Sequence, residues 1–402
     1  MKKRVLALML LFTVVFAGAC AQPQDQGGAG AGLGQSPDPL FNEDGVVAYV
    51  GGTIFESSLD PIKGGMSYGY SFTNCALLRV KPDSGYEGDM AIAWTVSDDA
   101  LVYTFELRQG VTFSDGSAFT ADDVVFTYQT VQANQANNEN VDLTKLSAAE
   151  ALDDYTVRFT LAEPYSPFLD AAACLGIVPS DSYDSARFDR YPIGTGAWIV
   201  CQYDPNQQII VEANEHYYEG PPAIKKVTFV ALDSQAAFAS ARSGQLDIVM
   251  AGPNYAAETV PGMSLERFAT MDIRMISLPV RPLQTLKNAA GEDLIVGNDV
   301  TADISVRQAL AIGLDRQTII DHAFNGVGRP AFSFTANLEW AETGADPDNR
   351  QDEAQALLTA AGWQDQDGDG IREKAGISCA FDVYAPGGDQ DRFLLASAVA
   401  ED

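Results

Sequence analysis

The chain has 402 residues and a formal charge of −30, which arises from 55 acidic and 25 basic side chains. That length predicts about two or three domains, because single hydrophobic cores stop growing near ~250–300 residues. The content of hydrophobic residues, 46%, excludes wholesale disorder. The acidity excludes nucleic-acid binding, which needs a basic surface, and the two histidines exclude a histidine-rich metal site.

An N-terminal pattern predicts export. A basic start precedes an apolar run over Val5–Phe16 and small residues directly before Cys20. This order is typical of a secretory signal over residues 1–19, whereas a membrane-spanning helix needs about 20 apolar residues. The cysteine resembles that of a bacterial lipobox, although lipoboxes usually carry leucine where Ala17 stands. We expect Cys20 to be lipidated and residues 20–42, rich in Gly, Gln and Pro, to form a flexible tether.

From Gly45 onward, strand and helix signals alternate. Stretches rich in β-branched and aromatic residues predict strands at Val46–Val50, Tyr103–Leu107, Val157–Leu161, Ile209–Val211, Val227–Ala231 and Phe381–Tyr384. Helices are expected after the N-cap residues Thr120, Asp303 and Asp315, at Ser234–Ser243 before Gly244, and at Arg392–Asp402. The alternation predicts a mixed α/β protein of more than one domain, and its abrupt end suggests a truncated C-terminus.

Four further cysteines, Cys75, Cys174, Cys201 and Cys379, match no zinc spacing. We interpret them as structural residues, free or paired. The two glycines that bracket Thr195 predict a position where the backbone must bend or approach another segment closely.

Short motifs follow one another in a fixed order between residues 46 and 376. They are Ser58-Leu59-Asp60-Pro61, Tyr103-Thr-Phe-Glu-Leu-Arg108, Phe113-Ser-Asp-Gly116, Tyr191-Pro-Ile-Gly-Thr-Gly196, Asn214-Glu-His-Tyr-Tyr-Glu-Gly220, Gly244-Gln-Leu-Asp247, Val306-Arg-Gln-Ala-Leu310 and Asp367-Gly-Asp-Gly-Ile371. Their order resembles the family 5 extracellular solute-binding proteins, which are the peptide and nickel receptors of bacterial ABC importers.

The resemblance implies an α/β, two-lobed, periplasmic-binding-protein-like fold of type II, with an extra inserted domain and an incomplete second lobe. One lobe would comprise domain I, residues 43–72 plus 185–275, together with the inserted domain II, residues 73–184. The other lobe would be domain III, residues 276–402, truncated at its C-terminus. The two lobes would close on a ligand about a hinge.

The resemblance also places ligand contacts. Gly65-Met66-Ser67-Tyr68 would lie at the mouth of the cleft, where main chain can bond an extended peptide as an added strand. Arg274, Met275 and Ser277 lie where the chain would cross between lobes, and Trp340 would stack on a ligand from the second lobe.

The segment that begins at Gly65 also suggests an alternative function. Gly65-x-Ser67-x-Gly69 matches the G-x-S-x-G motif of serine hydrolases, which would make Ser67 a nucleophile and His322 the only sensibly placed candidate base. That motif must follow a buried strand, whereas a turn containing Pro61 and Lys63 precedes it here. A secreted serine hydrolase is therefore the weaker hypothesis.

An acidic loop offers a second alternative. Asp365, Asp367 and Asp369 occupy positions 1, 3 and 5 of a calcium loop. Position 12, which should be a bidentate acid, is Gly376, and Glu373 is only a partial substitute. A solvated turn is favoured, and a calcium-dependent surface protein is the alternative function.

The residues and the resemblance together predict a substrate-binding lipoprotein of an ABC importer, with no catalytic residue, cofactor or metal. Its partners would be a small peptide ligand, the membrane subunits of an ABC permease and, through the lipid anchor, the outer face of the cell membrane. We expect a monomer that binds no nucleic acid. Nickel complexes, haem, glutathione and oligosaccharides are the alternative ligands within the family.

Overall fold

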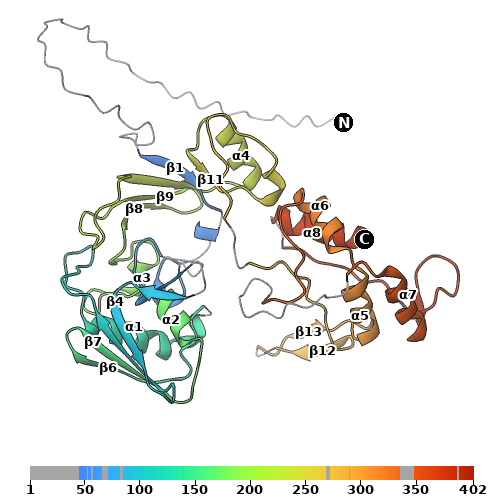
Figure 1. Cartoon of the computed structure of the whole chain (residues 1–402), viewed down its shortest axis with the longest axis horizontal. Coiled ribbons are helices and arrows are strands. Elements are labelled where there is room, and N and C mark those ends of the chain that lie inside the picture. Colours follow the sequence, from blue (N-terminus) through green and yellow to red (C-terminus); the bar gives the residue numbers. More distant parts are fainter. Residues whose placement is uncertain are drawn as a thin grey trace, which may run out of the picture. The chain divides into compact units, whose positions relative to one another are not determined.

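A computed structural model of the chain describes residues 45–51, 53–55, 58–65, 71–81, 85–138, 140–268, 272–288, 290–335, 348–386 and 389–402 (Figure 1). Within these ranges, five strands form a mixed sheet in the order β11-β1-β10-β9-β8. Their bounds are β1 Val46–Tyr49, β8 Trp198–Asp204, β9 Gln208–Ala213, β10 Lys226–Val230 and β11 Ile248–Val249.

Strand β1 runs parallel to both β10 and β11, while β10, β9 and β8 continue antiparallel. The Val47 N–H donates to Asp247 Oδ2 at 2.8 Å, across 200 residues of sequence. Both neighbours of β1 in the sheet therefore come from segments much later in the chain. Helix α4 (Ser234–Arg242) leads into β11, and Asp233 caps it by accepting a hydrogen bond from the Ala236 N–H at 2.8 Å.

A second, antiparallel sheet has the order β4-β5-β7-β6 among the described strands. Its strands are β4 Ala91–Val96, β5 Val102–Leu107, β6 Leu146–Asp153 and β7 Thr156–Leu161. Inward-facing residues alternate along β5 and β7, as expected for strands with one covered face. Helix α1 (Ala121–Ala133) packs on β6 and β7.

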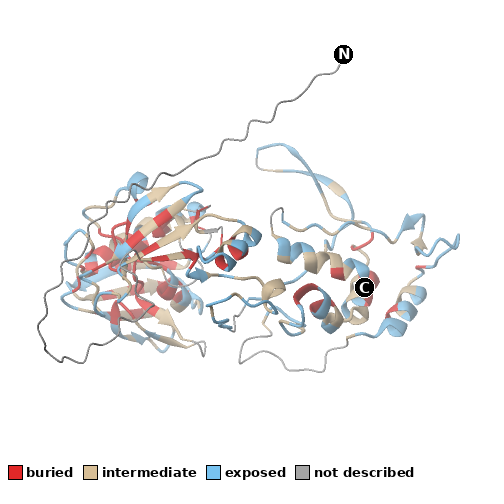
Figure 2. Cartoon of the chain, turned by 90° about the horizontal axis from the view of Figure 1, so that it is seen from above, coloured by how far each residue is buried: buried red, intermediate tan, exposed pale blue. Residues whose placement is uncertain are grey.

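Aromatic side chains fill the core between α1 and this sheet, and they are among the residues coloured red in Figure 2. The ring of Phe159 lies 5.7 Å from Phe105, 4.5 Å from Tyr128 and 5.3 Å from Phe168, measured between centroids. At the start of α1, Asp123 Oδ2 accepts a hydrogen bond from the Thr120 N–H at 2.9 Å. This contact fixes the helix start that the sequence predicts.

Two passages of the chain connect the two sheets and touch each other. The buried Asn74 donates from Nδ2 to the carbonyl oxygens of Ile177 and Ile193, both at 3.0 Å. The Gly196 N–H donates to the Thr73 oxygen at 2.8 Å. A Cβ atom on Gly194 would lie 2.0 Å from that same Thr73 oxygen. The predicted close approach at the glycines around residue 195 is therefore confirmed.

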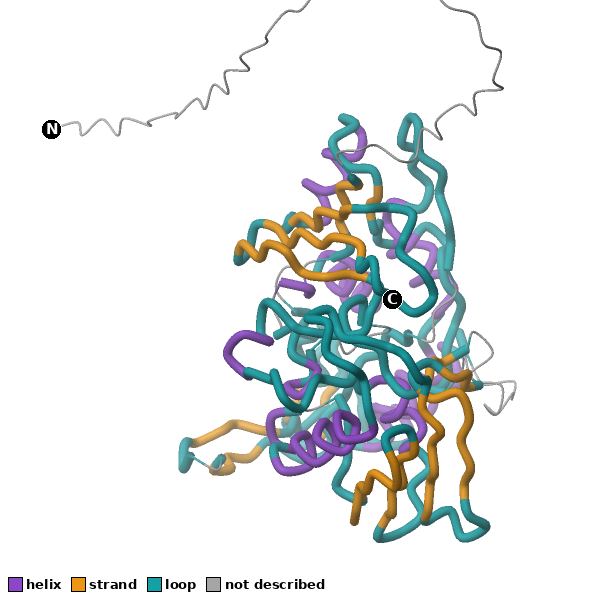
Figure 3. Tube along the Cα trace, turned by 90° about the vertical axis from the view of Figure 1, so that its left-hand side faces the viewer, coloured by secondary structure: helices purple, strands orange, loops and turns teal. Residues whose placement is uncertain are grey.

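In the remaining part of the chain, the longest regular elements are helices, and loops join them. The elements of this part are the hairpin β12 Gln284–Lys287 and β13 Asp293–Val296, the helices α5 Ile304–Gly313, α6 Arg316–Phe324, α7 Gln351–Ala360 and α8 Gln390–Glu401, and the pair β14 Glu373–Lys374 and β15 Ile377–Ser378. Helix α5 packs on α7, and α6 packs on α8. Trp363, 1% exposed, joins the core beside α5. The described residues between 256 and 283 belong to no helix or strand. Figure 3 shows how much of the described trace is loop, drawn in teal.

The other elements are short. They are β2 Leu78–Val80, β3 Tyr86–Gly88, α2 Phe168–Cys174, α3 Ser185–Phe188, and 3-10 turns at Thr53–Phe55, Pro61–Lys63, Gln135–Asn137 and Pro253–Tyr255. Cys75, Cys174, Cys201 and Cys379 are all free thiols. In the described part of the chain, no helix combines the length and the apolar character needed to cross a bilayer.

Most of the predicted strands and helices are confirmed, including the caps at Asp303 and Asp315. The strand predicted at Phe381–Tyr384 is wrong, because these residues pair with no described strand. Phe381 instead packs against the cluster around Trp363. A short run of apolar residues at the edge of a core has the same sequence pattern as a strand. Such a run forms a strand only where a neighbouring strand can pair with its backbone.

Candidate functional site

The Ser58–Asp60 motif and Gly65 form one tightly packed turn. Asp60 caps the 3-10 turn by accepting from the Ile62 N–H at 3.0 Å, and its Oδ2 accepts from the Tyr183 hydroxyl at 2.8 Å. Burial raises the pKa of Asp60, against these two hydrogen bonds, which lower it. The Gly65 N–H donates to the Asp60 oxygen at 2.8 Å, and a Cβ on Gly65 would lie 2.5 Å from the Ser58 oxygen.

This turn ends at Gly65, directly before the rest of the predicted cleft segment in the sequence. Met66, Ser67 and Tyr68 themselves lie outside the described residues. The absence of a side chain on Gly65 permits the close approach to Ser58, which gives Gly65 a scaffold role in addition to the expected ligand contact.

The second predicted contact segment has an unusual backbone. Arg274, Met275 and Ser277 are all exposed, and Arg274 forms an ion pair with Asp272. From residue 274 to residue 278, no backbone N–H or C=O group makes a hydrogen bond with another described residue. Such groups are available to a ligand that binds through its main chain. Trp340 lies outside the described residues.

A carboxylate that sequence reasoning missed lies near this segment. Burial raises the pKa of Asp391, in the first turn of α8, and Asp389 raises it further, while the Arg274 guanidinium opposes both effects. The structure therefore brings Arg274 within electrostatic range of α8, more than a hundred residues later in the chain. No local pattern in the sequence signals this proximity.

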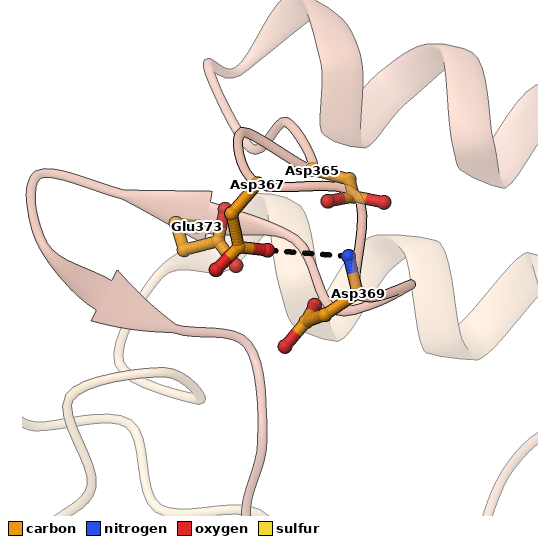
Figure 4. Close-up of side chains that lie close together, drawn as sticks. All are labelled: Asp365, Asp367, Asp369 and Glu373. Atoms are coloured by element: carbon orange, nitrogen blue, oxygen red, sulfur yellow. Dashed lines mark hydrogen bonds between the residues drawn. The ribbon is translucent and has the colours of Figure 1, made fainter.

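The acidic loop brings together the three predicted aspartates and Glu373, with carboxylate oxygens within 4.8 Å of one another (Figure 4). Asp365 already accepts hydrogen bonds from the N–H groups of Gly368 and Gly370, and Asp369 N–H donates to Asp367 at 3.2 Å. The three aspartates are exposed. These bonds within the loop support the solvated turn, which stays a prediction.

The residues of the hydrolase alternative are not brought together by anything the structure describes. Ser67 is outside the described residues, and His322 is an exposed residue of α6. Among the described side chains, no carboxylate accepts a hydrogen bond from the imidazole of His322, as the orientation of a catalytic base would require.

Comparison with known proteins identifies the family. Residues 85–402 match the sequence model of the bacterial extracellular solute-binding proteins, family 5 Middle. Protein XP55 of Streptomyces lividans is 33% identical over 389 residues, covering 93% of this chain and 68% of the relative. The oligopeptide-binding protein AppA of Bacillus subtilis is 28% identical over 432 residues, covering 100% of this chain and 75% of AppA.

Solved structures show the same fold. NikZ from Campylobacter jejuni, in complex with Ni(L-His), superimposes with a TM-score of 0.72 at 22% identity, covering 90% of this chain and 71% of NikZ. AppA from Bacillus subtilis, in complex with a nonapeptide, gives a TM-score of 0.61 at 25% identity, covering 82% of this chain and 66% of AppA. The predicted α/β periplasmic-binding-protein fold is confirmed, and the family consists of substrate-binding proteins rather than enzymes. The chain belongs to family 5 of the bacterial extracellular solute-binding proteins.

Proposed function

We propose that this protein is the substrate-binding lipoprotein of an ABC importer, and that it captures peptides outside the cytoplasmic membrane and delivers them to the permease. The observation that carries the proposal is the match to AppA over the whole chain, since AppA is named an oligopeptide-binding protein. A dipeptide-binding protein of Escherichia coli is also similar, at 29% identity over 306 residues.

Peptide capture needs main-chain hydrogen bonds that do not depend on the side chains of the cargo. The backbone groups from residue 274 to residue 278, which have no hydrogen-bond partner among the described residues, supply such bonds in this proposal. Arg274, Met275 and Ser277 contribute side-chain contacts, together with the segment Gly65–Tyr68 and Trp340. Met275 is 62% exposed, and its flexible thioether suits a cargo of varied shape.

The test is thermal unfolding of the purified protein with a pool of short peptides. Peptide at about 100 times its dissociation constant adds about 2.7 kcal/mol to the stability, which raises the melting temperature. Nickel with L-histidine forms a parallel sample, because a nickel-binding periplasmic protein of Escherichia coli is 28% identical over 335 residues. A melt that moves with the nickel complex and not with peptides would overturn the peptide assignment.

A matched pair of variants locates the site. Arg274→Ala and Arg350→Ala each remove an arginine from an exposed ion pair, with Asp272 and Glu353 respectively. Exposed pairs contribute about 0–1 kcal/mol, so neither change should alter the melt without ligand by much. We expect only Arg274→Ala to reduce the shift caused by peptides. If peptides raised the melting temperature of both variants equally, Arg274 would not be a peptide contact.

A further inference from the structure

A small pocket lies where the Phe113–Gly116 turn meets the Tyr191–Gly196 motif. The two segments are joined by a hydrogen bond from the Ser114 N–H to the Gly194 oxygen at 2.9 Å. The pocket has a volume of about 210 Å³. That volume is below the roughly 300–1,000 Å³ of pockets that hold drug-sized molecules, so its ligand must be smaller.

The pocket has an apolar floor and a charged rim. Ile193 and Val200, 4% and 6% exposed, form the floor together with the half-buried Ile199. Asp115 and Arg187 line the same pocket and are exposed to solvent. Apolar walls with a few polar groups at defined positions are the usual construction of a small-molecule site.

The guanidinium group of Arg187 has no partner among the described residues. This arginine lies in α3, and no carboxylate, hydroxyl or aromatic ring of the described residues pairs with its guanidinium group. Arg190, three residues later, differs because its guanidinium lies 5.7 Å from the centre of the Tyr203 ring. In a chain of charge −30, an arginine without an acidic partner beside an apolar pocket is available to an anionic group.

Asp115 is held in place but keeps capacity for a further donor. Its Oδ1 accepts from the Ser117 N–H at 3.0 Å and from the Ser117 hydroxyl, and its Oδ2 accepts from the Ser182 hydroxyl at 2.8 Å. A carboxylate oxygen can accept about two hydrogen bonds, so Oδ2 can take one more donor. The neighbouring hydroxyls keep this carboxylate in one orientation.

The two opposite charges determine the class of ligand. A simple anion would be repelled by Asp115, and a simple cation would be repelled by Arg187. A zwitterion with an apolar body satisfies both groups and the floor at once. We propose that this pocket binds a free α-amino acid with an apolar side chain, with its carboxylate on Arg187, its ammonium on Asp115 and its side chain against Ile193, Ile199 and Val200.

The test measures binding of L-leucine to the full-length protein by titration calorimetry or ligand-observed NMR. We expect saturable binding, and at least about tenfold weaker binding of 4-methylpentanoate, which lacks the ammonium, and of isopentylamine, which lacks the carboxylate. Leucine that does not saturate a site, or analogues that bind as well as leucine, would overturn the proposal.

Matched variants place the site. Arg187→Gln should weaken leucine binding at least about tenfold, whereas Arg190→Gln, in the same stretch of chain but outside the pocket, should leave it within about twofold. Leucine binding that survives Arg187→Gln would place the amino acid elsewhere and overturn the assignment. None of these residues is a proposed peptide contact, so the peptide melt and the leucine titration can fail independently.

Discussion

The hydroxyl group of Tyr128 lies in the core beneath α1 without a hydrogen-bond partner among the described residues. A buried hydroxyl without a partner destabilises the folded state by about 1–3 kcal/mol, and burial raises the pKa of this phenol. Tyr128→Phe keeps the ring and its packing against Phe159. We therefore expect the variant to raise the free energy of unfolding in urea by about 1 kcal/mol.

Tyr218 provides the opposite case. Its hydroxyl donates to Asp89 Oδ1 at 2.6 Å and accepts from Arg79 Nη2 at 2.6 Å. Because both partners are charged, Tyr218→Phe should lower the free energy of unfolding by about 1.5–3 kcal/mol. If the two variants were destabilised equally, the hydroxyl of Tyr128 would have a partner after all.

Gly194 shows how one absent side chain can decide the packing. A Cβ there would lie 2.0 Å from the Thr73 oxygen and 2.6 Å from Asn74 Cγ, and both groups are buried. We expect Gly194→Ala to lower the free energy of unfolding by about 3 kcal/mol or more. Gly220→Ala is the control, because Gly220 has φ +93° but nothing within 4 Å, and its backbone strain amounts to about 1 kcal/mol. If Gly194→Ala and Gly220→Ala lowered the free energy of unfolding by similar amounts, the close packing at Gly194 would be refuted.

At the scale of elements, we expect the stability of the start of α5 to depend on pH. Asp303 Oδ1 accepts from the Ser305 N–H at 2.9 Å, while Oδ2 accepts from Lys374 Nζ at 2.6 Å and from the Trp363 indole N–H at 3.1 Å. The Lys374 ammonium, followed by Ser305, holds the pKa of Asp303 well below its usual range. The stabilisation is therefore fully present above the unfolded pKa of about 3.9, and it is lost as pH falls toward the lower folded value.

Asp303→Ala should lower the free energy of unfolding by about 1–2 kcal/mol at neutral pH, mainly through the lost cap. The difference in the free energy of unfolding between this variant and the unmodified protein should shrink below about pH 4. Urea unfolding across a pH series would measure this difference. Asp315→Ala is the comparison, because Asp315 accepts hydrogen bonds from the Thr318 N–H at 3.0 Å and from Asn349 Nδ2 at 2.7 Å but has no lysine partner. These bonds, first that of the Thr318 N–H, also lower the pKa of Asp315, so its stability difference should shrink in acid as well, but less than that of Asp303→Ala. A difference for Asp303→Ala that stays constant down to about pH 3 would refute the role of the Asp303 charge.

The helices whose starts are marked by Thr120, Asp303 and Asp315 could be predicted, since a cap and the turn that follows it are adjacent in sequence. The pairing of β1 with β10 and β11 could not, because those contacts join segments far apart and no local residue encodes the partner. The strand expected at Phe381–Tyr384 failed for the same reason, since its apolar residues had a core to pack against but no strand to pair with.

At the scale of the whole molecule, the proposed anchor makes a prediction about location. Cys20 would carry the lipid, so the unmodified protein should sediment with membranes and Cys20→Ala should move to the soluble fraction. The measurement is fractionation of a bacterial host followed by immunoblotting. Cys75→Ala serves as the control, because Cys75 is a buried thiol of the folded part and has no proposed lipid. If Cys20→Ala sedimented as firmly as the unmodified protein, the anchor would lie elsewhere.

The family could be predicted from the order of motifs, because residues such as Asp60 and Gly194 hold backbone turns in place whatever the ligand. The candidate site was harder to predict. Arg274, Met275 and Ser277 are exposed residues in a segment without helix or strand, and exposed side chains leave no periodic pattern in a sequence. The proximity of Arg274 to Asp391 depends on folding across more than a hundred residues.

The contact between the two chain passages at Asn74 and Thr195 has a consequence for insertions and deletions in the gene. The Cys75 N–H donates to Thr195 Oγ1 at 3.3 Å, so residues 75–194 leave and rejoin the rest of the protein at neighbouring points. A stretch whose ends adjoin can be gained or lost in one recombination event, and a short turn then closes the gap. Because none of the strands of the five-stranded sheet lies between residues 75 and 194, we expect an insertion or deletion in this stretch of the gene to leave the strand order of that sheet unchanged.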